Sequence, residues 1–375
     1  FLTIGKAQNA VRAIDSSMAG DIIVYLRAGT YPSASPLVFD SSDSGTNGFH
    51  VIYRAYEHEV PVISGGVPVT DWKLDHGKVY RASLNRNTKL RSLFVNGVRA
   101  FMARSKNPVA GQGSAGTFTI AGTEPWVLNG ASGSEPDDIQ FNSAAVQTYA
   151  NPDDVELVQN NGFNSTIVSV RGICLNGSAG CNETNNLYTD FQLQQPYGAI
   201  AFDAYPPHVI NANGPFYVQN AYELLKSPGQ FYFDRKTQTL YYDSRGEDMS
   251  KAQVIAPTSE GLLQIHGESN TNRVRNLEFI GTTFAFDHWE MYNVAGSTGM
   301  AAIQSVAGMV KFTGSSNWHA VVYNDTQTAQ ASVDVQNADS ITFKKDSFQH
   351  LSSGIALSLT DDVINSNVTG NSFVD

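Results

Sequence analysis

Residues 331–375 read ASVDVQNADSITFKKDSFQHLSSGIALSLTDDVINSNVTGNSFVD, and this stretch decides the fold. Short runs of β-branched and aromatic residues alternate with polar residues and are interrupted by Asn, Asp, Ser and Gly. Such runs are typical of strands joined by tight turns. The pattern therefore predicts many short strands and almost no helix in this part of the chain.

The apolar runs recur at fixed spacings along the chain. The spacing is 25 residues from Phe343 to Val368 and from Phe348 to Phe373, 22 from Val333 to Ile355 and from Val335 to Leu357, and 64 from Phe279 to Phe343 and from Phe284 to Phe348. A period in the low twenties predicts a solenoid of strands, in which like residues stack at about 4.8 Å. The 64-residue spacing leaves room for an inserted loop between two turns. We therefore predict an all-β fold built as a parallel β-helix; a β-sandwich is the alternative.

The N-terminal residues predict a cap and the first turns of this solenoid. Residues 5–18 place Ala7, Val11 and Ile14 on one helical face, and a helix there would cover the open end of the first turn. The strands expected next are residues 20–26, 37–39, 51–53 and 60–64.

The middle of the chain predicts an inserted β-rich subdomain. Asn96-Gly97 is the sequence that a two-residue type I′ turn favours, so residues 94–98 should form a hairpin. Residues 231–242 predict a second hairpin, whereas residues 108–186 are rich in Gly, Ser and Asn. We predict three parts: residues 1–69 as the cap and first turns, 70–250 as the insertion, and 251–375 as the main turns.

Several stretches resemble a known group of proteins. They are GKAQNAVRAIDSSMAGDIIVYLRAGTY, PVISGG, LRSLFVNGVRAFMARSKNP, SPGQFYFD with TLYY, and FIGTTFAFDHW. Together they resemble the right-handed parallel β-helix proteins of the pectate-lyase-like superfamily, most closely its β-helical glycoside hydrolases with xylanase- and fucosidase-type members. The resemblance implies a right-handed coil and carbohydrate-directed activity, with catalytic acids on later turns. The chain stops in the middle of a repeat, so we expect either further turns or self-association through this uncapped end.

Composition narrows the classes of partner. Only 16% of residues are charged, 41% are hydrophobic and the formal net charge is −11, so the chain should be globular and is a poor match for nucleic acid or an anionic membrane surface. No apolar run approaches the roughly 20 residues of a membrane span. The chain starts at Phe1 without a signal sequence, which indicates a removed leader or a fragment.

The two cysteines and five sequons favour a secreted glycoprotein. Cys174 and Cys181 lie close together with no other cysteine in the chain, so we expect a local disulfide, with free thiols as the alternative. The glycosylation candidates are Asn164, Asn176, Asn182, Asn324 and Asn367. We expect a secreted, extracellular protein.

One cluster of acidic and aromatic residues follows the strand that ends at Phe284. Glycoside hydrolysis usually needs two carboxyl groups, and aromatic rings stack on sugar faces. Asp287 and Glu290 are therefore the catalytic candidates, and His288, Trp289 and Tyr292 are candidates for binding substrate. The alternative is a solvated loop with a packed Trp.

A second set of candidates lies on the turns near the end of the chain. His350 and Asp361 are further catalytic candidates, while Asp346 reads more simply as a turn residue. Trp318 and His319 are expected to bind substrate or to pack in a returning loop. We expect no cofactor or metal, apart from Ca²⁺ at the Asp361-Asp362 pair should the protein be a polysaccharide lyase.

Three functions are therefore open from the sequence. The first is a glycoside hydrolase acting on a cell-wall or extracellular polysaccharide. The second is a non-catalytic structural or adhesive glycoprotein on a β-helix scaffold, because a fold does not fix a function. The third is a polysaccharide lyase.

Overall fold

The computed structural model describes the chain in the following ranges: residues 1–105, 119–121, 124–128, 131–135, 138–142, 149–161, 164–175, 188–194, 216–288, 296–300, 303–305, 310–313, 320–323 and 331–375. Within these ranges the regular secondary structure is almost entirely β-strand, with one α-helix and a few short 3₁₀ turns. This confirms the predicted all-β class.

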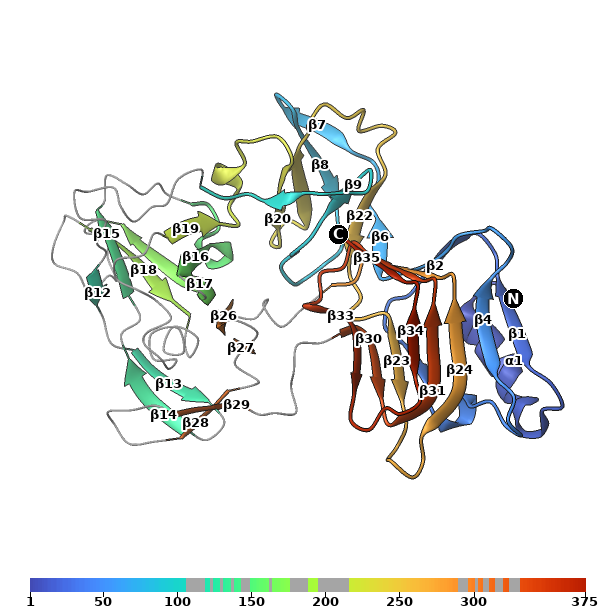
Figure 1. Cartoon of the computed structure of the whole chain (residues 1–375). Helices are drawn as coiled ribbons and strands as arrows, with labels where there is room; N and C mark the ends of the chain where they lie inside the picture. Colours follow the sequence, from blue (N-terminus) through green and yellow to red (C-terminus); the bar gives the residue numbers. More distant parts are fainter. Residues whose placement is uncertain are drawn as a thin grey trace.

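Three sheets with parallel pairing organise the first and last parts of the chain (Figure 1). Sheet A contains β1 (Ile22–Leu26), β4 (Val51–Ala55), β24 (Val274–Ile280), β31 (Ala338–Lys344) and β34 (Asn367–Thr369). Sheet B contains β2 (Gly29–Pro32), β5 (Pro61–Ser64), β25 (Thr283–Ala285), β32 (Ser347–Gln349) and β35 (Ser372–Val374). Sheet C contains β3 (Leu37–Phe39), β23 (Leu263–His266), β30 (Ala331–Gln336) and β33 (Ile355–Thr360). The chain visits A, B and C in this order on each pass, so consecutive passes stack strand on strand.

The strand register confirms two of the predicted spacings and corrects the third. Phe343 pairs with Phe279 and with Val368, as the 64- and 25-residue spacings predict. The 22-residue spacing is wrong, because Val333 pairs with Leu357, 24 residues on. A shift of two residues along a strand keeps every side chain on the same face, so alternation alone cannot distinguish the two registers.

Aromatic stacks fill the interior between the sheets. Phe279 stacks on Tyr53 and on Phe343, with ring centroids 5.4 Å and 5.6 Å apart. Phe284 stacks on Phe348 at 5.2 Å. All of these side chains are buried, in one core with aliphatic residues from the first four passes, whereas the apolar side chains of β34 and β35 are exposed. Since each pass alone could not bury its apolar face, stacking of the passes creates the core.

The N-terminal helix packs on this core but is shorter than predicted. Helix α1 (Ile4–Arg12) begins at the Thr3 cap and buries Ile4, Ala7 and Val11. The expected third member of the apolar face, Ile14, is 57% exposed, because the helix ends before it and a 3₁₀ turn, η1 (Asp15–Ser17), follows. A second such turn, η2 (Ser41–Asp43), lies after β3, and Asp43 binds Arg12.

The first inserted segment after β5 forms two further sheets, the first antiparallel and the second mixed, with one parallel pair. One contains β6 (Gly66–Pro68), β9 (Phe94–Val95), β10 (Val98–Arg99) and β22 (Val254–Pro257); another contains β7 (Lys73–His76), β8 (Val79–Ser83), β11 (Phe101–Met102), β20 (Gln230–Asp234) and β21 (Thr239–Asp243). Both predicted hairpins are present, with positive φ at Asn96 and Gly97 as a type I′ turn requires.

The remaining strands are mostly antiparallel neighbours of one larger sheet. They are β12 (Thr119–Ala121), β13 (Glu124–Leu128), β14 (Ala131–Glu135), β15 (Asp138–Asn142), β16 (Glu156–Asn161), β17 (Asn164–Leu175), β18 (Tyr188–Leu193), β19 (Phe216–Gln219), β26 (Gly296–Met300), β27 (Ile303–Ser305), β28 (Val310–Thr313) and β29 (Ala320–Tyr323), with the short turns η4 (Pro152–Asp154) and η5 (Tyr222–Leu224). β13 pairs with β14 and β28 with β29 as separate two-stranded units.

Candidate functional site at the corner between sheets B and C

Both long departures from the three parallel sheets begin at the same corner. The chain leaves sheet B after β5 and returns to sheet C at β23, and on the next pass it leaves after β25 and returns at β30. On the pass after that, β32 connects to β33 through only five residues, 350–354. The corner between sheets B and C therefore brings together residues from both insertions and from three consecutive passes.

Asp287 lies at this corner and is completely buried. Its carboxylate accepts hydrogen bonds from the Ser332 hydroxyl at 2.6 Å and from the Ser352 backbone N–H at 2.6 Å. The backbone N–H of Ser353, at 3.3 Å, and the Ser353 hydroxyl also donate to this carboxylate. Four donors compensate the cost of burying the charge. The carboxylate thus ties the start of the second insertion to its return strand and to the next pass.

His288 is also buried and contacts the first insertion. Its Nε2 lies 2.6 Å from a terminal nitrogen of Arg86, and its backbone N–H donates to the Ser259 carbonyl at 2.7 Å. A guanidinium group only donates, so Nε2 is the acceptor and the ring proton is on Nδ1. Arg86 also reaches the carbonyls of Thr88 and Pro257. His288 therefore joins the two insertions.

His350 occupies the equivalent corner one pass further on. Its ring stacks on Phe286 with centroids 5.2 Å apart, and the Phe94 ring of the first insertion lies 5.0 Å away. Both His350 and Phe286 have positive φ, which marks them as equivalent turn residues. Burial lowers the pKa of His350, against an opposing effect of nearby Asp375. The ring thus lies between two aromatic side chains.

Arg99 connects the hairpin β9–β10 to the segments that follow β32 and β35. Its guanidinium donates to both carboxylate oxygens of Asp375 and, at 2.7 Å, to the Leu351 carbonyl. It also donates to the Ser92 hydroxyl at 3.0 Å and lies over the Phe94 ring at 4.7 Å. Hydrogen bonding from Arg99 lowers the pKa of Asp375.

The remaining described candidates lie at other corners. Asp361 has φ 50° in the turn that follows β33, between sheets C and A, and its carbonyl accepts from the Asn337 N–H. Its neighbour Asp362 pairs with Arg273. Strand β33 has six residues, about 20 Å of extended chain, so Asp361 is not brought together with Asp287 and His350.

Asp346 occupies the corner between sheets A and B. It is 1% exposed, and its Oδ1 accepts the Thr282 N–H of the preceding pass at 2.7 Å. Asn371 of the following pass accepts the Asp346 N–H at the same distance. This ladder matches the turn-residue interpretation. Burial raises the pKa of Asp346 to about 7.

Several predicted residues lie outside the described ranges, and for others only the backbone is described. These are Glu290, Trp289, Tyr292, Trp318, His319, Cys174, Cys181, Asn164, Asn176, Asn182 and Asn324. Their roles, including the disulfide, stay predictions. Asn367 is exposed on β34, and its glycosylation also stays a prediction.

A buried ionic network lies inside the first insertion. Glu156 is fully buried and binds Arg91 through both carboxylate oxygens, at 2.7 Å and 2.6 Å. Lys89 donates to Glu156 and to Ser169, each at 2.9 Å. Burial alone would raise the pKa of Glu156, but Arg91 and Lys89 lower it to about 2. The charges are thus compensated within the fold.

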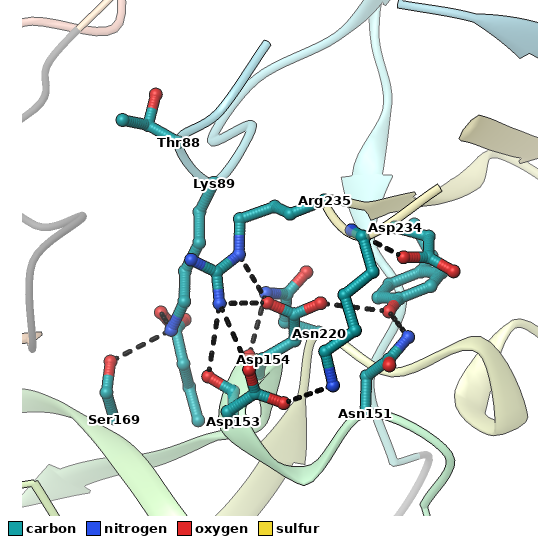
Figure 2. A network of polar contacts seen from close by, with 12 residues as sticks. Thr88, Lys89, Asn151, Asp153, Asp154, Ser169, Asn220, Asp234 and Arg235 are labelled. Atoms are coloured by element: carbon teal, nitrogen blue, oxygen red, sulfur yellow. Dashed lines mark hydrogen bonds and ion pairs between the residues drawn. The ribbon is translucent and has the colours of Figure 1, made fainter. Parts of the chain in front are cut away.

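A neighbouring part of the network joins the hairpin β20–β21 to η4, as Figure 2 shows. Arg235 binds Asp154, and Tyr232 donates its hydroxyl to the same carboxylate at 3.1 Å. Asn151 donates its side-chain amide to the Tyr232 hydroxyl at 3.0 Å, and Lys236 donates to Asp153 at 3.0 Å. Since these carboxylates are buried or paired, we interpret the network as structural.

Sequence reasoning missed the arginines and the polar residues of sheet C. Arg86 and Arg99 are far from the corner in sequence and carry no motif that points there. Asp334 accepts from His266 at 2.8 Å and from Gln336 at 2.8 Å on the outer face of sheet C. The signal for these residues was alternation within β23 and β30, where polar residues take every second position. No group of three or more His, Cys, Asp or Glu side chains within the described ranges could hold a metal ion.

Comparisons with known proteins agree with this architecture. The family model of the GH141 insertion domain matches residues 135–245. A solved structure described as "Glycoside hydrolase" superposes with a TM-score of 0.67 at 22% identity, over 93% of this chain and 58% of that chain. The chain thus spans 58% of the length of that protein.

The similarity to other known proteins is weaker. A structure described as "The complex structure of XylC with xylose" gives a TM-score of 0.29 at 14% identity, over 94% of this chain and 40% of that one. No curated protein matches the chain. Among the described residues, no helix has the length and apolar character that a bilayer crossing requires. The fold is glycoside-hydrolase-like, as the resemblance in sequence implied.

Proposed function

We propose that this protein is a secreted, carbohydrate-active glycoside hydrolase that acts on a cell-wall or extracellular polysaccharide. We further propose that sheets A, B and C are the faces of a right-handed parallel β-helix of the pectate-lyase-like type. The match of residues 135–245 to the GH141 insertion domain and the glycoside-hydrolase-like fold support both proposals.

The observation that carries the proposal is the common origin of the two insertions. Both leave from the corner between sheets B and C, and one of them contains the segment that matches the insertion domain. Active sites are often formed by loops that a rigid scaffold positions. A stack of parallel strands is such a scaffold, and this corner is where it carries its loops.

The contacts of Asp287 suggest how the site is assembled. Asp287 is buried and saturated by serine donors, so its role here is to position the segment that follows it. That segment contains Glu290, Trp289 and Tyr292, which can supply a carboxyl group and two sugar-stacking rings. In this proposal Glu290 is the acid or base, and the sequence-based catalytic role of Asp287 is replaced by positioning.

The test is hydrolysis of a panel of neutral and acidic polysaccharides and aryl glycosides by the full-length protein. We expect release of reducing ends from at least one substrate, and a loss of at least 100-fold in kcat for Glu290→Gln. Glu268→Gln is the matched control, because Glu268 is exposed and, among the described residues, its carboxylate accepts a hydrogen bond from Asn272 alone. Binding without cleavage across the panel would instead support the non-catalytic glycoprotein.

A further inference from the structure

The outer face of sheet C carries a patch of polar side chains next to the corner between sheets B and C. Strand alternation places one set of side chains in the core and the other outside. Five half-buried polar residues of the outward set on β23, β30 and β33 form what we call the sheet C patch, which includes one carboxylate and one imidazole. Its members are Gln264, His266, Asp334, Gln336 and Ser358; Thr360, on the same face, is exposed and lies at its edge.

Asp334 is the fixed centre of the sheet C patch. One of its oxygens, Oδ2, accepts from His266 Nε2 on one neighbouring strand and from Gln336 on its own strand, both at 2.8 Å. The Asp334 side chain is 19% exposed and that of His266 is 32% exposed. Two donors on one oxygen fix the rotamer and leave Oδ1 to accept from another group.

The neighbouring members keep hydrogen-bonding groups that no described residue satisfies. Gln264 and Ser358 pair with Asp334 in the strand register, one on each side, and neither side chain bonds a described residue. Within the described part of the chain, the His266 ring hydrogen-bonds through Nε2 alone. The sheet C patch thus presents amide, imidazole, carboxylate and hydroxyl groups at strand spacing, about 4.8 Å apart.

The position of the sheet C patch links it to the proposed site. Ser332 lies two residues before Asp334 on the same face of β30 and donates to Asp287. Two residues of strand span about 7 Å. The patch therefore begins beside the residue that anchors the second insertion, and the insertion returns to the sheet at Ala331.

The chemistry of the sheet C patch indicates the class of ligand. Asp334 is held by two hydrogen bonds, and Gln264 and Ser358 keep donors and acceptors that no described residue uses. Such groups suit the hydroxyls of a sugar, because a site built to bond hydroxyls discriminates against groups that leave its own polar atoms unpaired. The patch contains Asp334 and no Lys or Arg, so an acidic sugar would meet a like charge there. The outer face of sheet A differs, since it carries the cations Arg54, Arg275 and Lys344 together with the acidic residues Glu278 and Asp339.

We propose that the sheet C patch is a binding subsite for a neutral sugar unit of an oligosaccharide. The proposal rests on the proposed carbohydrate-directed function and deepens it. Asp334 and Gln264 bond sugar hydroxyls, and His266 and Gln336 are positioning residues that hold Asp334. The sugar chain extends from the sheet C patch toward the corner at Asp287.

Titration calorimetry of the full-length protein with xylohexaose and with hexagalacturonate tests this proposal. We expect the neutral hexamer to bind more tightly than the anionic one. Asp334→Asn and Gln264→Ala should each weaken binding of the neutral hexamer roughly tenfold, which corresponds to the loss of one hydrogen bond to a charged or fixed group. Thr342→Ala is the matched control on the outer face of sheet A and should bind as wild type does.

The outcomes separate this proposal from the proposed function. If the hexamer binds and the Asp334 and Gln264 variants bind it equally well, the subsite is wrong while the carbohydrate function stands. If the anionic hexamer binds more tightly through the same residues, the neutral class is wrong. If only another neutral glycan binds, the same two variants must weaken its binding, and equal binding again overturns the subsite. Absence of all glycan binding overturns both proposals. Circular dichroism checks that each variant is folded.

Discussion

Phe279 and Phe343 stack face to face with ring centroids 5.6 Å apart and an angle of 11° between the rings, although 64 residues separate them in the chain. Their Cα atoms are register partners of adjacent parallel strands. The chain between them leaves the sheets after β25 and returns at β30. The stack therefore stays continuous across an insertion, and the stability of the core should depend on it.

Truncating a ring inside this stack should destabilise the protein strongly. Phe343 is completely buried between Phe279, Phe284 and Phe348. Phe343→Ala removes the ring and leaves a cavity, so we expect a loss of about 3–5 kcal/mol in the free energy of unfolding. Urea denaturation followed by tryptophan fluorescence measures this loss.

The matched control is the same substitution at an exposed ring. Phe101 is 65% exposed, and Phe101→Ala should change the free energy of unfolding by less than about 1 kcal/mol. Equal effects of the two substitutions would show that the stacked rings are not the centre of the core.

The all-β class and the parallel register of the stacked strands were predictable from the sequence because a short pattern of side chains repeats along it. The positions of Phe279, Phe343 and Phe348 in the pattern, and the Asn96-Gly97 turn, needed only neighbouring residues to interpret. The predicted partner of Val333 was wrong by two residues. Its register depends on the length of the loop between the strands, which the pattern of side chains does not reveal. The prediction that Ile14 lies on the buried face was wrong because the helix ends before it, and the end of a helix depends on its cap and on the residues that pack there.

The site was much less predictable, for a physical reason. The groups around Asp287 come from Ser332, Ser352 and Ser353, and those around His350 come from Phe94 and Phe286. Serine is common in loops, and nothing in its sequence context distinguishes a carboxylate donor from a solvated hydroxyl. Only the order in which the chain visits the sheets brings these residues to one corner.

The stability of the protein should depend on pH through Asp346. Burial raises the pKa of this carboxyl to about 7 in the folded chain, against a reference value of 3.8. Between these two pH values the unfolded chain has released the proton and the folded chain keeps it, so the folded state binds more protons. The contribution of Asp346 to the free energy of unfolding therefore falls as the pH rises from about 4 to about 7 and is constant outside this window.

Asp346→Asn isolates this contribution from those of other groups. The amide keeps an oxygen to accept the Thr282 N–H and does not ionise. Relative to wild type, we expect the variant to be about 2–4 kcal/mol more stable at pH 8 and nearly equal at pH 4. Thermal or urea denaturation at both pH values gives the comparison. A difference that does not change with pH would contradict a neutral Asp346 in the fold.

Replacing Asp287 should loosen the corner more than it affects the core. Asp287→Ala leaves the Ser352 N–H and the Ser332 and Ser353 hydroxyls without their acceptor, for a cost of about 2–4 kcal/mol. Asp287→Asn keeps an acceptor oxygen and should cost less. Hydrogen exchange should increase at residues 350–354 in both variants, and unchanged exchange there would argue against the anchoring role.

The buried ionic network should make the first insertion sensitive to one carboxylate. Glu156→Gln removes the carboxylate that Arg91 and Lys89 both bind, and removing one partner of a buried pair costs about 3–5 kcal/mol. Lys236→Ala is the control, because that lysine pairs with Asp153 near the surface and should contribute less than about 1 kcal/mol. Limited proteolysis, read by mass spectrometry, locates the damage: cleavage should increase within the inserted segment while sheets A, B and C stay protected. Cleavage that begins in those sheets instead would mean that the insertion and the stacked strands unfold as one unit.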